Sequence, residues 1–296
     1  MSKLVEAVQE NNQQIQTLQI NTTWVLRGFK NTDNVSCYAN TVVQSLLHLS
    51  AIRKQLFNCD KSNILRMLMH RYEYGMNNLN TYDVQQDLGE SFSMNVKLDA
   101  LKFLTILCTK YDFVRDLVQQ EVTSTTRCVT CHITKTICFN NLFISIPINK
   151  LKKKNYNLKE LLDVLFSHWH QSDNGFCENC TGNNILYKNE LTLTKDIIII
   201  YFVLFLSEED KVIKAKRNFN ISSIPTTKVL VAGQSYKVIN AIFHNGLSID
   251  KGHYTNICRE GSSNNWIEID DTEIRKDNGP EVLKIFIYFF TKIDRK

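Results

Sequence analysis

The stretch that decides the fold is Gly28-Phe29-Lys30-Asn31-Thr32-Asp33-Asn34-Val35-Ser36-Cys37-Tyr38-Ala39-Asn40. A polar loop meets an apolar, helix-like pattern here, and Cys37 stands at the junction. Far along the chain follow Gly252-His253-Tyr254-Thr255 and Trp266-Ile267-Glu268-Ile269-Asp270-Asp271. A cysteine, a histidine and a carboxylate are the groups that nucleophilic thiol catalysis requires.

Cys37 is the cysteine whose local sequence best suits a nucleophile. The unpaired N–H groups at a helix start favour a thiolate, and Asn34 or Ser36 is placed to cap the helix that follows. The alternative is a buried structural thiol at a helix start. The later histidine and aspartate segments favour catalysis.

His253 and Asp270 are the predicted partners of this thiol. Gly252 lets the backbone approach closely, and His253 opens a strand-like run that ends near Cys258. The alternation after Trp266 places Asp270 at the end of a neighbouring strand, where its carboxylate would accept the imidazole Nδ1–H. Alternation also points only one of Asp270 and Asp271 at the histidine. A half-buried structural histidine is the alternative for His253.

Composition narrows the class of protein. The chain has 296 residues, of which 43% are hydrophobic and 22% charged, values typical of a globular protein with a sizeable core. Its net charge of +5 includes one short basic run, Lys152-Lys153-Lys154, which argues against a nucleic-acid partner. The longest apolar run, Ile197 to Leu206, is shorter than the roughly 20 residues of a membrane-spanning helix. The amino terminus lacks the apolar core of a signal peptide. We therefore expect a soluble, intracellular protein, cytoplasmic or nuclear, with no membrane partner.

The cysteines predict a metal site. The chain holds nine, an odd number that argues against a disulfide framework in a protein without a secretory signal. Two Cys-x-x-Cys pairs, Cys128 with Cys131 and Cys177 with Cys180, have the donors of a tetrahedral, structural Zn²⁺ site. Cys138 is a competing ligand, and four unmetallated thiols are the alternative. No His-Glu-x-x-His motif of a metalloprotease occurs.

Helical periodicity dominates the first part of the chain, and strand-like runs the second. We predict a weakly helical or mobile leader over 1–23, then helices from Ser36 onward and at 52–57, 61–75, 98–119 and 158–168. Strands are predicted at 122–127, 133–138, 142–148, 188–206, 236–243, 254–259 and 283–290. This order predicts an α+β fold in which a helical lobe packs against an antiparallel sheet.

At these residues the chain resembles the ubiquitin-specific protease family of deubiquitinating enzymes. The family's cysteine box is matched by Gly28–Asn31 and by Cys37-Tyr38-Ala39-Asn40-Thr41-Val42-Val43-Gln44-Ser45-Leu46. Its histidine box is matched by Tyr236–Gly246, Gly252-His253-Tyr254 and Trp266–Asp271. Asp99-Ala100-Leu101-Lys102-Phe103-Leu104 resembles a further motif, for which Gln85-Gln86-Asp87 is the poorer match. The resemblance covers about residues 24–292.

The resemblance implies a papain-like cysteine peptidase fold over 24–296. Its parts would be a helical thumb at about 36–119, zinc-ribbon-like fingers at about 120–200 and an antiparallel palm sheet at about 188–292. It further implies that His244 belongs to the scaffold of the site. The zinc would lie at the tip of the fingers.

The resemblance also implies an activity, the removal of ubiquitin from protein lysines. Cys37 would attack the C-terminal glycine carbonyl of ubiquitin, with His253 as the acid and base and Asp270 as its orienting group. Asn31 would stabilise the oxyanion. Asn34 is its rival, because this chain has one residue more than the family between Asn31 and Cys37. Ubiquitin and ubiquitinated proteins are the expected partners of a monomer.

Two other functions stay open at this point. The inserted residue beside Cys37 leaves room for a catalytically inactive scaffold that binds ubiquitin without cleaving it. A protease for another ubiquitin-like modifier would need the same cysteine, histidine and aspartate. Reaction with a ubiquitin tail that carries a thiol-reactive group separates an enzyme from a binding module.

Overall fold

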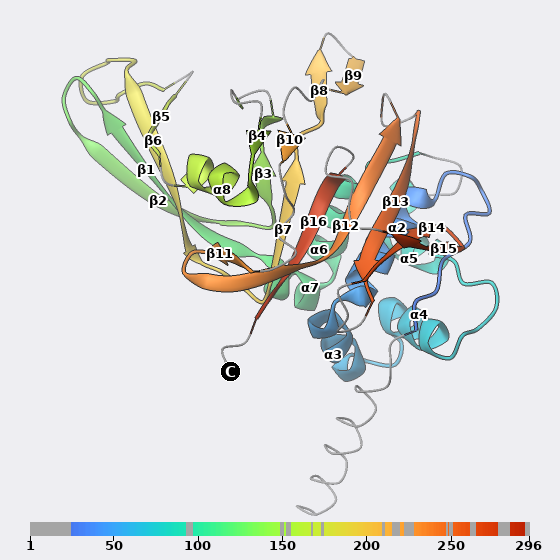
Figure 1. The fold of residues 1–296 in the computed structure, drawn as a ribbon. Helices are drawn as coiled ribbons and strands as arrows, with labels where there is room; N and C mark the ends of the chain where they lie inside the picture. Colours follow the sequence, from blue (N-terminus) through green and yellow to red (C-terminus); the bar gives the residue numbers. More distant parts are fainter. Residues whose placement is uncertain are drawn as a thin grey trace, which may run out of the picture.

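The fold combines a helical lobe, a central sheet and a second sheet that projects away from the lobe (Figure 1). The computed structural model describes residues 25–92, 97–148, 151, 155–166, 168–172, 175–208, 211–214, 220–221, 228–246, 248, 251–260, 265–277 and 285–293. The leader predicted over 1–23 and the basic run at 152–154 lie outside the described residues.

The helical lobe follows the predicted order of helices, with one split and one omission. Its elements are α2 (Cys37–His48), α3 (Ser50–Asn58), α4 (Ile64–Glu73), α5 (Tyr82–Leu88), the 3₁₀ turn η1 (Glu90–Phe92), α6 (Ala100–Lys110) and α7 (Asp112–Val118). The helix predicted over 98–119 is two helices, because Tyr111 is extended, with φ −105° and ψ 95°. Helix α5 was not predicted. Among the described residues, no helix combines the length and apolarity of a membrane span.

Helix α2 lies at the centre of the molecule. It contacts α3 and α6 on the helical side and β12 and β13 of the central sheet. Every residue from Cys37 to Leu47 is buried. Within the helical lobe, the buried Gln44 of this helix donates from Nε2 to the Tyr72 hydroxyl at 2.7 Å. A helix buried on all sides is part of the core, so its two ends are fixed in position.

The central or palm sheet is almost wholly antiparallel. Its strand order is β15 (Glu273–Asp277), β14 (Trp266–Asp270), β13 (Gly252–Arg259), β12 (Gln234–Gly246), β16 (Ile285–Lys292), β7 (Ile197–Phe202) and β3 (Ile144–Ile146). A short strand, β11 (Val229–Val231), pairs with β12 beside this path. Only the β3–β7 pair among these described strands is parallel. The apolar run in β7 is buried, as expected of a strand covered on both faces.

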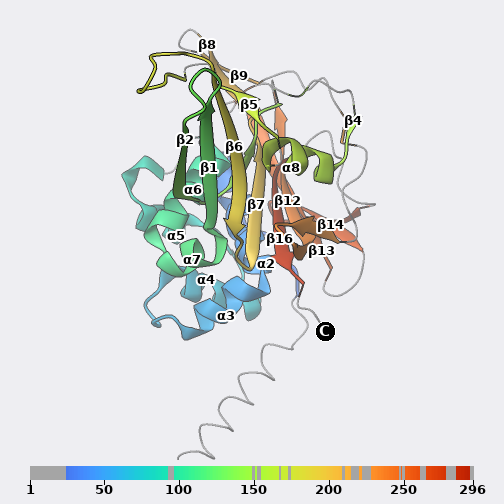
Figure 2. The ribbon, with the colours of Figure 1, turned by 90° about the vertical axis from the view of Figure 1, so that its left-hand side faces the viewer.

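The second or finger sheet extends away from the helical lobe, as Figures 1 and 2 both show. Its strand order is β2 (Thr134–Asn141), β1 (Gln120–Cys128), β6 (Ile185–Leu193) and β5 (His170–Gln171). Helix α8 (Leu158–Phe166) contacts β6 and β11. Two small pairs complete the described strands: β4 (Asn155–Tyr156) with β10 (Asn220–Ile221), and β8 (Phe205–Glu208) with β9 (Lys211–Lys214).

The strand predicted over 188–206 is three strands in three different sheets, β6, β7 and β8. The break between β6 and β7 is held by Gln120, which is buried at the start of β1. Its Nε2 donates to the Ile197 carbonyl at 2.9 Å, and its Oε1 accepts from the Lys195 N–H at 3.0 Å. This side chain supplies the hydrogen bonds that the chain loses as it leaves one sheet for the other.

Asn240 joins the end of α2 to the palm sheet. The Leu49 N–H, which would bond to Ser45 in a continued helix, bonds to the Leu46 carbonyl instead. The Ser45 carbonyl accepts from Asn240 Nδ2 on β12 at 3.1 Å. A buried side-chain amide therefore satisfies a helix-end carbonyl and sets the spacing between helix and sheet.

We predict that Asn240→Ala lowers the free energy of unfolding by about 1–3 kcal/mol, since it leaves a buried carbonyl without its donor. Asn245→Ala is the matched control, because Asn245 lies on the same strand and is exposed. Urea unfolding of both variants measures the difference. Equal stabilities would contradict this role of Asn240.

Candidate active site and metal centre

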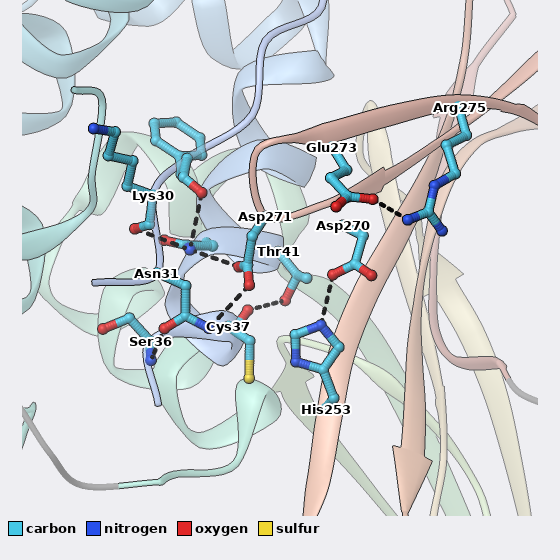
Figure 3. A network of polar contacts seen from close by, with 12 residues as sticks. Lys30, Asn31, Ser36, Cys37, Thr41, His253, Asp270, Asp271, Glu273 and Arg275 are labelled. Carbon is cyan, nitrogen blue, oxygen red and sulfur yellow. Dashed lines mark hydrogen bonds and ion pairs between the residues drawn. The ribbon is translucent and has the colours of Figure 1, made fainter. Parts of the chain in front are cut away.

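Cys37, His253 and Asp270 come together from three elements (Figure 3). Cys37 is the first residue of α2, His253 lies at the start of β13 and Asp270 ends β14. Because β13 and β14 are antiparallel neighbours, the start of one lies beside the end of the other. His253 Nε2 is 2.6 Å from Asp270 Oδ1.

The imidazole contacts both partners, one through each ring edge. The sequence predicted that Asp270 would accept a hydrogen bond from Nδ1 of His253. This prediction was wrong, since Asp270 contacts Nε2 of the ring. The carboxylate comes from the next strand and meets the ring edge far from the backbone, while Nδ1 lies on the side of Cys37 (Figure 3). Cys37 is 3% exposed, whereas 40% of the His253 side chain is exposed. The site therefore opens to solvent beside the histidine.

The neighbours of His253 favour its protonated form. Its pKa is raised to about 9, first by the hydrogen bond with the Cys37 side chain and then by Asp270, while burial acts in the opposite direction. At neutral pH the ring is an imidazolium between a sulfur and a carboxylate. Such a group stabilises a thiolate and is ready to donate a proton.

The start of α2 is capped differently from the prediction. Neither Asn34 nor Ser36 makes a side-chain cap within the described part of the chain. The Ser36 N–H instead donates to Asn31 Oδ1 and to Asp33 Oδ1, each at 3.0 Å. Asn34 is exposed and has a φ of 58°, so it serves a left-handed turn, a conformation that asparagine tolerates.

Asp271 ties the cysteine loop to the turn after β14. Its Oδ2 accepts from Asn31 Nδ2 and its Oδ1 from Asn40 Nδ2, both at 2.9 Å, and its carbonyl accepts from the Phe29 N–H at 3.0 Å. A Cβ on Gly28 would lie 1.9 Å from that carbonyl oxygen, so only glycine allows this approach. Asp270 thus faces the histidine, as strand alternation predicts, and Asp271 faces the cysteine loop.

A buried chain of hydrogen bonds supports Asn40 from behind. Thr81 Oγ1 donates to Asn40 Oδ1 at 2.8 Å, and Gln85 Nε2 donates to Thr81 Oγ1 at 3.1 Å. The hydroxyl of Tyr38 donates to Gln85 Oε1 at 3.1 Å. Thr81 and Gln85 were not predicted to support the site, although the Gln85-Gln86-Asp87 run was a signal. Asp99 belongs to the segment that matches the family motif better, and its Oδ1 caps α6 by accepting from the Leu101 N–H at 2.6 Å.

The four cysteines of the two Cys-x-x-Cys pairs meet at the end of the finger sheet. Their sulfur atoms all lie within 4.8 Å of one another, and the Cys128–Cys180 and Cys131–Cys177 pairs are each 3.6 Å apart. A tetrahedral zinc with Zn–S bonds of about 2.3 Å would hold its sulfurs about 3.8 Å apart. Cys138 lies along β2 beside Thr123 and is outside the cluster.

The two cysteine loops have the same backbone geometry. The His132 N–H bonds to the Cys128 carbonyl at 3.0 Å, and the Thr181 N–H bonds to the Cys177 carbonyl at 2.9 Å. Residues 132 and 181 have left-handed φ values of 61° and 55°. Backbone N–H groups in the first loop donate to Cys128 and lower its pKa to about 6. All nine cysteines are free, so these donors are suited to hold a metal ion.

Known proteins resemble this chain in sequence and in fold. A family model described as ubiquitin carboxyl-terminal hydrolase matches residues 27–290. The SAGA Ubp8/Sgf11/Sus1/Sgf73 DUB module bound to ubiquitin aldehyde matches with a TM-score of 0.73 and 17% identity, over 92% of this chain and 70% of that one. A Ubp8 variant in this module bound to monoubiquitin gives 0.73 and 16%, over 100% and 76%. A yeast SAGA module with an altered Sgf73 gives 0.72 and 17%, over 92% and 69%.

We predict that His253 titrates near pH 9 in an NMR titration, well above its usual pKa of about 6.5. Cys37→Ala should lower this pKa more than Asp270→Asn, because the cysteine is the larger cause. The stabilising effect of the imidazolium is fully present below the unfolded pKa and is lost as the pH rises through about 9. A wild-type midpoint near 6.5 would contradict this electrostatic description.

Proposed function

Since this chain belongs to the ubiquitin carboxyl-terminal hydrolase family and is a cysteine-type deubiquitinating enzyme, we propose that it cleaves ubiquitin from protein lysines with Cys37, His253 and Asp270. The observation that supports these roles most directly is the position of His253. Its ring contacts Asp270 through Nε2 and hydrogen-bonds Cys37, at the first residue of a buried helix.

The proposed reaction proceeds in two steps. The Cys37 thiolate attacks the carbonyl carbon of the C-terminal glycine of ubiquitin, and the protonated His253 gives its proton to the leaving lysine amine. The products of this step are a free lysine and a thioester on Cys37. His253 then takes a proton from water, which attacks the thioester and releases the ubiquitin carboxylate and the cysteine. Asp270 keeps the ring oriented throughout.

Asn31 is the proposed donor to the oxyanion. Its Nδ2 carries two hydrogens and gives one to Asp271, so a second N–H remains for the substrate oxygen. Its Oδ1 accepts from the Ser36 N–H, which fixes the orientation of the amide beside Cys37. Asn34 does not share this support, because it is exposed on a turn.

For Asn31→Ala we predict a fall in kcat of about 10²–10³-fold, the usual cost of one oxyanion donor, with little change in KM. Asn34→Ala, the matched control, should keep wild-type kcat. Steady-state hydrolysis of a fluorogenic ubiquitin conjugate compares the two variants. The reverse ranking would assign the role to Asn34.

We predict that Cys37→Ala abolishes cleavage of an isopeptide-linked diubiquitin and leaves ubiquitin binding intact. Cys59→Ala is the control, since Cys59 is a free cysteine at the end of α3. Gel-based turnover and calorimetry measure cleavage and binding separately. If wild-type protein binds ubiquitin without cleaving the conjugate, the inactive scaffold is favoured. If it cleaves only conjugates of another ubiquitin-like modifier, a protease for that modifier is favoured.

Ubiquitin is the proposed partner because two similar structures contain it. One of them is a module bound to ubiquitin aldehyde, and the other is a module bound to monoubiquitin. The domain limits, the monomeric state, the intracellular location and the absence of a nucleic-acid partner stay predictions.

The four-cysteine cluster is the proposed site of a structural Zn²⁺. Two matched loops present four sulfurs at spacings close to a zinc tetrahedron, and four protein ligands leave no open position for catalysis. When bound, the metal would link β1 and β2 to the loop before β6, and so stabilise the end of the finger sheet.

We predict one zinc ion per chain by elemental analysis of the purified protein. Cys177→Ser should lose the metal and lower the melting temperature, because three ligands bind zinc more weakly and leave thiolates uncompensated. Cys138→Ser, outside the cluster, should keep both metal and stability. A metal-free, fully stable wild-type protein would contradict this proposal.

A further inference from the structure

Gln85 on α5 is a buried amide of the helical lobe, with 2% of it exposed. Helix α5 contacts α4, α6 and η1, so this side chain reaches the thiol segment from another part of the lobe. A glutamine amide has two N–H donors and one acceptor oxygen. In Gln85 all three are used, and two of them contact the residues on either side of Cys37.

The two residues that flank Cys37 are both buried and both bond to this amide. Gln85 Nε2 donates to Ser36 Oγ at 3.3 Å, and Gln85 Oε1 accepts from the Tyr38 hydroxyl at 3.1 Å. Burial raises the pKa of Tyr38, so its hydroxyl keeps the proton that it donates. A single side chain from α5 therefore holds the backbone before and after the thiol.

The neighbouring hydroxyls require an amide at position 85. The Ser36 hydroxyl gives its hydrogen to Asp33 Oδ2 at 2.8 Å, so towards Gln85 it accepts. The Thr81 hydroxyl gives its hydrogen to Asn40 Oδ1 at 2.8 Å, and it also accepts from Gln85, at 3.1 Å. The surroundings thus demand two donors and one acceptor from one planar group. Loss of any of them leaves a buried polar group without a partner.

The contact with Ser36 also leads to the proposed oxyanion donor. The Ser36 N–H donates to Asn31 Oδ1 at 3.0 Å, and this bond fixes the amide of Asn31. Gln85 is therefore one residue removed from Cys37 and one removed from Asn31, although it lies on a different helix. A displacement of Ser36 would move both groups relative to a bound carbonyl.

We propose that Gln85 is a positioning residue for the thiol, which holds Cys37 in the place from which it meets His253 and the substrate carbonyl. The inference rests on the proposed function and adds a residue that contacts none of the reacting atoms. Its effect on rate is expected to be large, because a misplacement of about 1 Å can cost roughly 100-fold.

The test compares two glutamines that are adjacent on α5. Gln85→Met keeps the length of the buried side chain and removes its polar groups, and Gln86→Met makes the same change at an exposed position. We expect Gln85→Met to lower kcat for a fluorogenic ubiquitin conjugate by about tenfold or more, with little change in KM. Gln86→Met should keep wild-type kcat.

One readout needs no ubiquitin, and so separates this inference from the proposed function. The NMR titration midpoint of His253 should fall from about 9 towards its usual value in Gln85→Met, since the contact with Cys37 is the largest cause of the raised pKa. A wild-type protein that does not cleave ubiquitin would contradict the proposed function, and the fall in this midpoint would still support the role of Gln85.

Tyr38→Phe tests the same contact from its other side. This change removes one hydroxyl and keeps the ring, which packs against Phe103 with the centroids 5.4 Å apart. It should lower kcat as well, and adding it to Gln85→Met should cost no further activity, because the hydroxyl has then already lost its acceptor.

A merely structural role for Gln85 gives a different result. Gln85→Met would then lower the melting temperature, while the folded variant would keep the kcat and the His253 midpoint of Gln86→Met. That result overturns the proposal, as do fully additive losses of activity in the double variant of Gln85 and Tyr38. Circular dichroism confirms that each variant is folded at the temperature of the assay.

Discussion

The geometry of the thiol site depends on the hydrogen bonds that the carboxylate of Asp271 accepts. One oxygen holds Asn31 from the cysteine loop, the other holds Asn40 from α2, and the backbone carbonyl holds Phe29. The residue before it, Asp270, contacts His253. Two adjacent aspartates at the end of one strand thus fix the loop that precedes the thiol and the imidazole that faces it. The buried chain through Thr81 and Gln85 supports the same joint from the helical lobe.

The rest of the fold keeps the two sides of the site at a fixed distance. Helix α2 is buried along almost its whole length, and Asn240 bonds its far end to the palm sheet. The sulfur therefore sits on a rigid element, and the imidazole sits on a strand of the sheet that packs against it. The closeness of the Cys37 side chain, and then of Asp270, raises the pKa of His253 to about 9. The finger sheet is a separate layer, and its cysteine cluster lies at its end, apart from this joint.

The sequence indicated which segments meet at the candidate site, but not the hydrogen bonds that join them. That Cys37, His253 and Asp270 lie together was predictable, because a helix start, a glycine-preceded strand and strand alternation are local features. The ring nitrogen, the capping of α2 and the role of Gln85 were not, because each depends on contacts between distant segments. Asn34 has a left-handed backbone conformation and forms a turn before α2, so it does not cap the helix as predicted. The run over 188–206 was predicted as one strand because β-forming residues dominate it. The break between β6 and β7 depends on hydrogen bonds from the buried and distant Gln120.

The proposed activity depends on activation of Cys37 by the imidazole that this framework holds beside it. The most direct measurement is incubation of the full chain with ubiquitin that carries a C-terminal electrophile, followed by intact mass and peptide mapping. We predict a single adduct, on Cys37, that is absent from folded His253→Ala protein. A folded wild-type protein that forms no adduct, or that is labelled on another of its nine cysteines, would contradict the account.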